Sequence, residues 1–123
     1  MKEISNHKGL NSIWTDSLAR NLNPDGNALV DHLITVHQKH TGFTEECASS
    51  CRDKSGRNSY EWLAEIVPNK ESLSVLDLAC GSGPLLKILF NRNKNLNLKG
   101  VDMCLEELEL AKTRLSNCRV NLI

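Results

Sequence analysis

Residues 75–86 read VLDLACGSGPLL, a short apolar run that leads into a loop with two glycines. The apolar run itself extends over residues 73–79, LSVLDLA, and is almost continuous. Such a run predicts a strand buried on both faces of a parallel sheet. Pro84 suits the first turn of a following helix, because its missing N–H would have no partner there. The stretch therefore predicts a strand, a glycine loop and a helix in succession.

The residues after this helix repeat the alternation. Residues 96–101 predict a second strand, which ends at Asp102, and residues 104–116 predict a helix with one apolar face. A third strand is expected from about residue 119. This order indicates the α/β class and the first half of a Rossmann-like parallel sheet that binds a nucleotide-like ligand.

The loop and the strand-end acid narrow the choice of ligand. Gly81 and Gly83 allow a sharp turn and close approach of a ligand, while Asp102 is placed to accept the hydroxyls of a ribose. A plain glycine turn beside an exposed aspartate is the structural alternative. Leu86 replaces the third glycine of a dinucleotide fingerprint, which disfavours NAD and FAD, and no GK[ST] follows for a P-loop. Asp77 would repel a pyrophosphate but could bind an ammonium group.

Together with GVDMCLEELELAKTRL at 100–115, the glycine-loop segment resembles the first two motifs of class I S-adenosylmethionine-dependent methyltransferases. The resemblance covers about residues 59–123 and implies S-adenosylmethionine as the cofactor. The residues that it implies for cofactor binding are Asp77, Ala79, Gly81, Gly83, Asp102, Met103 and Tyr60.

By this resemblance, Asp77 organises the amino group of the cofactor and Asp102 holds its ribose. Met103 would lie beside the adenine, and Ala79 stands where the motif usually has its first glycine. Tyr60 would place an aromatic ring near the cofactor, with a packed helix tyrosine as an equal alternative. The resemblance assigns no catalytic residue.

The N-terminal part of the sequence is expected to be helical. Apolar spacing predicts helices over 10–22 and 29–40, a third that starts with Thr44 as N-cap, and a fourth from Asn58 or Ser59 to Ile66. By resemblance, residues 1–58 form a helical lid region and residues 59–123 form a partial Rossmann-like cofactor-binding domain.

Composition sets the broad class of the protein. The 123 residues carry 15 basic and 15 acidic side chains, which removes a global attraction for nucleic acids and favours a small-molecule substrate. No apolar run is long enough to span a bilayer and the N-terminus lacks the apolar section of a secretory signal, so we expect a cytoplasmic protein without a membrane partner. A zinc site from Cys47, Cys51, His37 and His40 is disfavoured by their spacing, and no metal is expected.

The family fold has seven strands, whereas this sequence supplies three. We therefore expect a fragment, a truncated product or half of an assembly, with an exposed sheet edge through which the chain could form a homo-oligomer. The resulting hypothesis is the cofactor-binding part of an enzyme that transfers a methyl group to a small molecule. The alternative is a non-catalytic module that binds a partner or dimerises.

Overall fold

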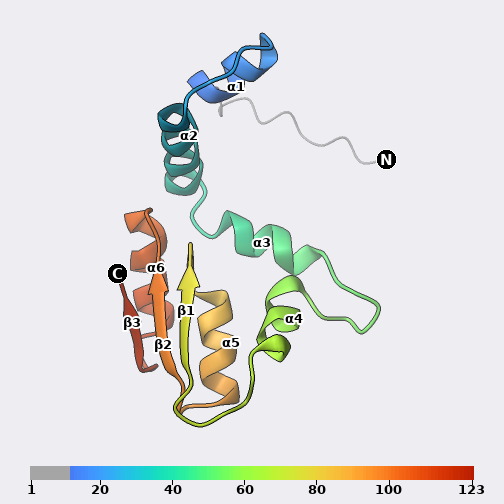
Figure 1. Cartoon of the computed structure of the whole chain (residues 1–123), viewed down its shortest axis with the longest axis vertical. Helices are drawn as coiled ribbons and strands as arrows, with labels where there is room; N and C mark the ends of the chain where they lie inside the picture. The colour runs from blue at the N-terminus through green and yellow to red at the C-terminus, as the bar shows by residue number, and fades with distance from the viewer. Residues whose placement is uncertain (1–11) are drawn as a thin grey trace.

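The computed structural model describes residues 12–123 and confirms the α/β class. These residues form six helices and three strands, which are arranged as in Figure 1. Their bounds are α1 Ile13–Ala19, α2 Gly26–Lys39, α3 Phe43–Ser50, α4 Ser59–Ile66, β1 Ser74–Leu78, α5 Pro84–Arg92, β2 Asn97–Val101, α6 Leu105–Arg114 and β3 Val120–Leu122. No helix in this part of the chain has the length and apolar character that crossing a membrane requires.

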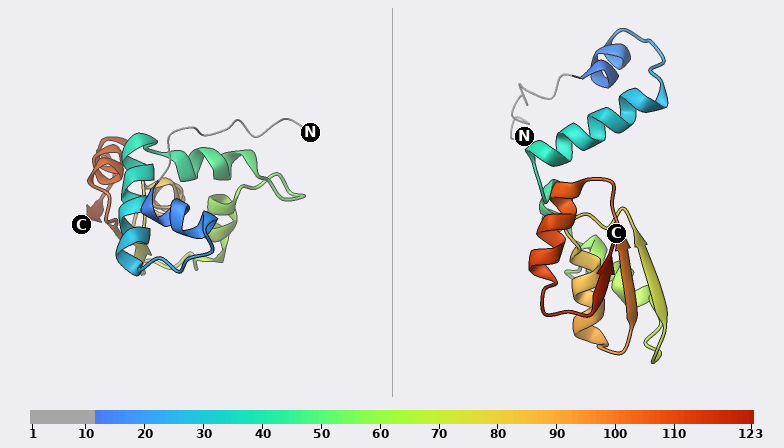
Figure 2. Two further views of the ribbon diagram at one scale, coloured as in Figure 1. Left: turned by 90° about the horizontal axis from the view of Figure 1, so that it is seen from above. Right: turned by 90° about the vertical axis from the view of Figure 1, so that its left-hand side faces the viewer.

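The strands form one parallel sheet in the order β1-β2-β3. In its register, Leu98 of β2 lies beside Val75 of β1 and Val120 of β3. Helices α5 and α6 lie on one face of the sheet, and α4 packs beside α5 (Figure 2). The core fills the space between this face and the helices. Its buried apolar residues are Ala64, Cys80, Leu86, Leu89, Leu96, Leu98, Leu108, Ala111 and Leu115.

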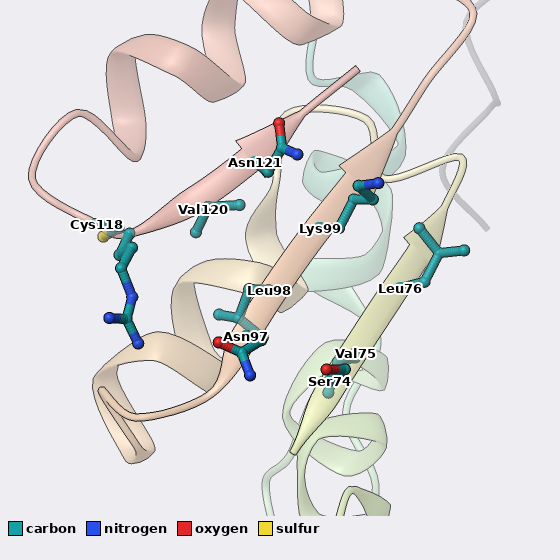
Figure 3. A pocket seen from close by; sticks show the side chains of 10 residues that line it. Ser74, Val75, Leu76, Asn97, Leu98, Lys99, Cys118, Val120 and Asn121 are labelled. Carbon is teal, nitrogen blue, oxygen red and sulfur yellow. The ribbon is translucent and has the colours of Figure 1, made fainter. Parts of the chain in front are cut away.

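The second face of the sheet is uncovered by any element in residues 12–123, so the prediction that β1 is buried on both faces is wrong. Leu76 is 54% exposed and Leu78 is 70% exposed. A hollow of about 690 Å³ runs along the strands, with Leu76, Lys99 and Asn121 among its lining residues (Figure 3). The apolar run is compatible with a strand that is buried on both faces. In the structure, only the alternate residues Val75 and Asp77 are partly buried.

The N-terminal helices follow the predicted pattern with shifted ends. Ser12 caps α1, which ends at Ala19, and Leu10 of the predicted helix lies outside the described residues. Asp25 caps α2, whose first turn begins at Gly26, three residues before the predicted start. None of the residues of α1, α2 and α3 is fully buried.

The predicted N-cap of the third helix is wrong. The cap of α3 is Gly42, which has a φ of +80°, and Thr44 lies inside the helix. The backbone N–H of Gly42 donates to the carboxylate of Glu107 in α6 at 2.9 Å. A contact with a distant helix therefore fixes this turn, and local sequence carries no sign of it.

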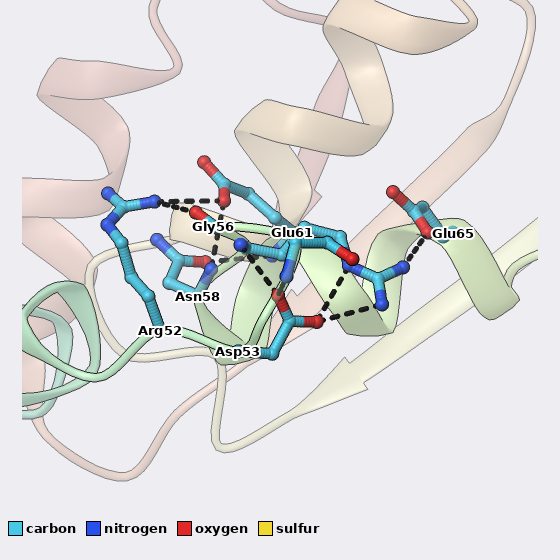
Figure 4. A network of polar contacts seen from close by, with 8 residues as sticks. Arg52, Asp53, Gly56, Asn58, Glu61 and Glu65 are labelled. Atoms are coloured by element: carbon cyan, nitrogen blue, oxygen red, sulfur yellow. Dashed lines mark hydrogen bonds and ion pairs between the residues drawn. The ribbon is translucent and has the colours of Figure 1, made fainter.

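The loop before α4 is held by a network of polar contacts (Figure 4). The Asp53 carboxylate accepts hydrogen bonds from the backbone N–H groups of Ser55 and Arg57, at 2.8 and 3.0 Å. Asn58 and Glu61 form a reciprocal capping box at the start of α4. The fourth helix therefore begins at the predicted place, because its start signal is local.

Candidate functional site

Three residues of the glycine loop between β1 and α5 adopt the left-handed backbone conformation. Ala79, Gly81 and Gly83 have φ values of +58°, +54° and +78°. A β-carbon on Gly83 would lie 2.8 Å from Cδ1 of Leu115, so α6 packs directly against this position. Around Gly81 the nearest atom to such a β-carbon would be Oε2 of Glu107, at 3.9 Å. Gly83 therefore serves packing, while Gly81 leaves room on its side of the loop.

The structure brings Asp102 and the glycine loop together. Oδ2 of Asp102 accepts a hydrogen bond from the backbone N–H of Gly81 at 2.8 Å, and Oδ1 accepts one from Cys104 at 2.8 Å. The carboxylate is thus fixed across the carboxyl ends of β1 and β2. An ionised carboxylate has about four acceptor positions, so both oxygens retain capacity for a ligand.

A cavity of about 240 Å³ lies at this end of the sheet, and Gly42 of the turn between α2 and α3 is among its lining residues. Five of the seven predicted site residues line it, namely Tyr60, Ala79, Gly81, Asp102 and Met103. The other two do not line it. Gly83 lines a neighbouring hollow that also contains Tyr60, and Asp77 lies in β1, two residues before the loop.

Negative charge dominates the electrostatics of the site. Burial raises the pKa of Asp77, and the charge of Asp102 raises it further. Burial, followed by the charges of Asp77 and Asp102, raises the pKa of the Cys80 thiol to about 11. The pKa of Tyr60 is raised by burial and by the charges of nearby acids. Neither aspartate forms an ion pair with any residue in 12–123, so the site favours a cationic ligand over a phosphate.

Sequence reasoning missed Glu107, a carboxylate in α6 whose residue is only 2% exposed. Its Oε1 accepts the N–H of Gly42 and lies 2.9 Å from Nδ1 of His37 in α2. Its Oε2 is buried without a hydrogen-bond partner. The spacing in the sequence could have indicated its burial, because Glu107 shares one face of α6 with the buried residues Cys104, Leu108 and Ala111.

A second polar cluster joins α3 to the glycine loop. The Ser82 hydroxyl donates to Oε2 of Glu45 at 2.9 Å, and the Arg114 guanidinium donates to both of these side chains. Glu45 and Ser82 lie 37 residues apart in sequence, and nothing in the sequence indicates that they meet. The α2–α3 segment is therefore held by two separate sets of contacts, one to Glu107 of α6 and one to Ser82 of the glycine loop.

The fold does not bring together the four residues considered for a zinc site, Cys47, Cys51, His37 and His40. Residues 12–123 contain no group of three or more His, Cys, Asp or Glu side chains arranged to hold a metal ion. Cys47 and Cys51 are exposed, and His37 pairs with Glu107.

Comparison with known proteins gives matches among solved structures alone: no protein-family model matches the chain, and no curated protein matches it. A methyltransferase from Geobacter sulfurreducens, in complex with S-adenosyl-L-homocysteine, is 26% identical over 52% of this chain and 27% of its own, with a TM-score of 0.46. Phosphoethanolamine N-methyltransferase 2 of Haemonchus contortus, in complex with S-adenosyl-L-methionine, is 25% identical over 49% of this chain and 14% of its own, with a TM-score of 0.42.

The sugar N-methyltransferase KedS8 from a Streptoalloteichus species is 26% identical over 50% of this chain and 25% of its own, with a TM-score of 0.39. The chain spans about a quarter of the length of the first structures that it matches. Over about half of its length, the chain is similar to solved S-adenosylmethionine-dependent methyltransferases.

Proposed function

We propose that this chain is the S-adenosylmethionine-binding part of a methyltransferase. The observation that carries this proposal is the pair of carboxylates without cationic partners, Asp77 and Asp102, beside a glycine loop in the order of the methyltransferase motifs. S-adenosylmethionine carries a sulfonium and an ammonium group and no phosphate. Its charge therefore suits a site in which Asp102 lines the cavity and the partly buried Asp77 adds a second negative charge nearby.

The residues of the chain bind and orient this cofactor. Asp102 holds the ribose hydroxyls, because its carboxylate is already fixed by two backbone N–H groups at the strand ends. Gly81 and the left-handed loop allow the cofactor to approach the backbone closely. Asp77 orients the amino group directly or through water. Met103, which is 55% exposed, offers an apolar surface to the adenine, and Tyr60 forms a side wall of the cavity.

The chemistry rests mainly on positioning. When bound, S-adenosylmethionine would supply an electrophilic methyl group for transfer to a substrate nucleophile, with S-adenosylhomocysteine as the leaving group. The part of the chain described contributes cofactor-binding side chains, and we assign none of them as a general base. A neutral formal charge favours a small-molecule acceptor over a nucleic acid.

Calorimetric titration with S-adenosylhomocysteine tests the proposal. We expect the wild-type chain to bind, and Asp102→Ala to weaken binding by about 1 to 3 kcal/mol, the range for hydrogen bonds to a charged group. Asp102 also holds Gly81 and Cys104, so thermal unfolding of the variant must be measured in parallel. Glu109→Ala, an exposed position on α6, is the matched control. A wild-type chain that does not bind the compound would contradict the proposal.

A non-catalytic module that dimerises or docks on a partner remains the second candidate. The observation that favours it is the uncovered sheet face, where Leu76 and Leu78 are exposed. This candidate predicts self-association without ligand binding, so the titration and a measurement of molecular mass distinguish the two functions.

A further inference from the structure

We propose that Glu107 couples ligand binding to the position of the α2–α3 turn, with one carboxylate oxygen holding the turn and the other accepting a hydrogen bond from the ligand. The inference rests on the proposed function, and it gives a role to Glu107, a residue of the second motif to which the resemblance assigns none. Its evidence is the unequal use of the two oxygens.

The first oxygen of Glu107 is fully engaged. Oε1 accepts the N–H of Gly42 at 2.9 Å and lies 2.9 Å from Nδ1 of His37. Gly42 is the cap of α3 and His37 lies in the last turn of α2, so this one atom holds both ends of the turn. The α2–α3 turn and the helices on either side of it border the cavity, whose lining residues include Leu33, Gly42, Thr44 and Glu45.

The second oxygen is unused. Oε2 is buried and has no hydrogen-bond partner, although a carboxylate removed from water loses solvation that a partner would replace. It lies 3.9 Å from the point where Gly81 would carry a β-carbon, and Gly81 and Glu107 both line the cavity. A buried acceptor without a partner, in a residue that lines a cavity, is expected where a bound ligand donates the missing hydrogen bond.

Asp102 and Glu107 flank the same loop residue. Gly81 donates its N–H to Asp102 and lies next to Oε2 of Glu107. A ligand held by Asp102 is therefore adjacent to Glu107, and an amino or hydroxyl group of S-adenosylmethionine is the class of donor that fits. Oε2 is buried while Gly42 and His37 contact Oε1. The α2–α3 turn must therefore move away from Glu107 to admit the ligand. When the turn closes again, Gly42 and His37 return to Oε1.

Glu107→Gln separates the two roles. The amide oxygen of glutamine can still accept from Gly42, while its NH₂ group replaces the acceptor that faces the loop. We expect hydrogen exchange of residues 36–46 in the ligand-free variant to stay within about twofold of wild type. We expect its affinity for S-adenosylhomocysteine, measured by calorimetry, to fall about tenfold or more, as loss of a charged hydrogen bond implies.

Two further variants frame this result. Glu107→Leu removes both roles, so exchange of residues 36–46 should rise about tenfold and affinity should fall together with it. Glu109→Gln, on the exposed side of the same helix, should match wild type in both measurements. An affinity of Glu107→Gln equal to that of wild type would overturn the inference.

The wild-type chain supplies a readout that does not depend on the folding of any variant. Saturation with S-adenosylhomocysteine should slow exchange of the Gly42 amide, because a ligand that engages Oε2 also holds the turn closed. Unchanged exchange at Gly42 with the ligand bound would overturn the coupling while leaving the proposed function intact. Absence of binding to the wild-type chain would instead remove the proposed function.

Discussion

At the scale of single residues, Asp77 illustrates a cost in stability at a candidate ligand site. Burial raises the pKa of its carboxyl above the ordinary value of 3.8, and the nearby charge of Asp102 adds to the effect. Above that raised pKa the folded chain must keep a carboxylate that is better solvated in the unfolded chain. Stability is therefore diminished at neutral pH and recovers as the pH falls through the raised pKa.

Asp77→Asn should accordingly increase the free energy of unfolding at pH 7. The gain should shrink as the pH is lowered toward 4, where the wild-type side chain also becomes neutral. Urea unfolding between pH 4 and pH 8 measures both effects, with Asp31→Asn on the exposed surface of α2 as the control. A gain that is the same at every pH would show that the charge of Asp77 is not its cause.

The two loop glycines make a matched pair for a second prediction. Alanine at either position must adopt a positive φ, which costs about 1–2 kcal/mol. Only at Gly83 does the added β-carbon also meet a buried side chain, 2.8 Å from Cδ1 of Leu115. Gly83→Ala should therefore lower the free energy of unfolding by about 1–3 kcal/mol more than Gly81→Ala in urea titrations. Equal losses would mean that α6 shifts without cost.

At the scale of helices and strands, what the sequence predicts well is what local signals control. Pro84 begins α5 and Asn58 caps α4 as expected, because a missing N–H and a capping side chain act within one turn. The start of α3 depends instead on Glu107, which lies 65 residues away from Gly42 in sequence, and no local pattern contains that contact. Tertiary partners therefore account for the misplaced cap.

The candidate site divides in the same way. The pairing of Gly81 with Asp102 was predictable, because the element order of a parallel α/β sheet brings the two strand ends together. The contacts of Glu45 with Ser82 depend on how α3 crosses the loop, which side-chain periodicity does not encode. Burial of β1 was overestimated for a related reason, since an apolar run does not say how many faces are covered.

At the scale of the whole molecule, the sheet has helices on one face, and no element in residues 12–123 covers the other. The exposed apolar side chains of this face include Leu76, Leu78 and Ile123, and within residues 12–123 β1 pairs with β2 alone. Apolar side chains beside an unpaired strand edge favour association between chains. The charged residues that line the hollow are Lys99 and Arg119, and no acidic residue lines it.

We therefore predict that the chain of 123 residues self-associates through this face. Light scattering over a range of concentrations should give a mass that rises above the monomer value of 13.7 kDa. The double variant Leu76→Lys with Leu78→Lys should return the mass toward the monomer, because two added cations repel each other and Lys99 across the contact. Both side chains are already more than half exposed, so the core should be unaffected.

The control for this last prediction is a pair of exposed apolar residues elsewhere. Ile13 and Leu18 of α1 are 76% and 50% exposed and lie on a helix that packs against α2, away from the sheet. Ile13→Lys with Leu18→Lys should leave the association unchanged, since it adds the same charge on a different surface. If this control variant dissociates the chain as well as the β1 variant does, the contact lies on the helices, and if the wild-type mass stays monomeric at every concentration, the open face is stable in water by itself.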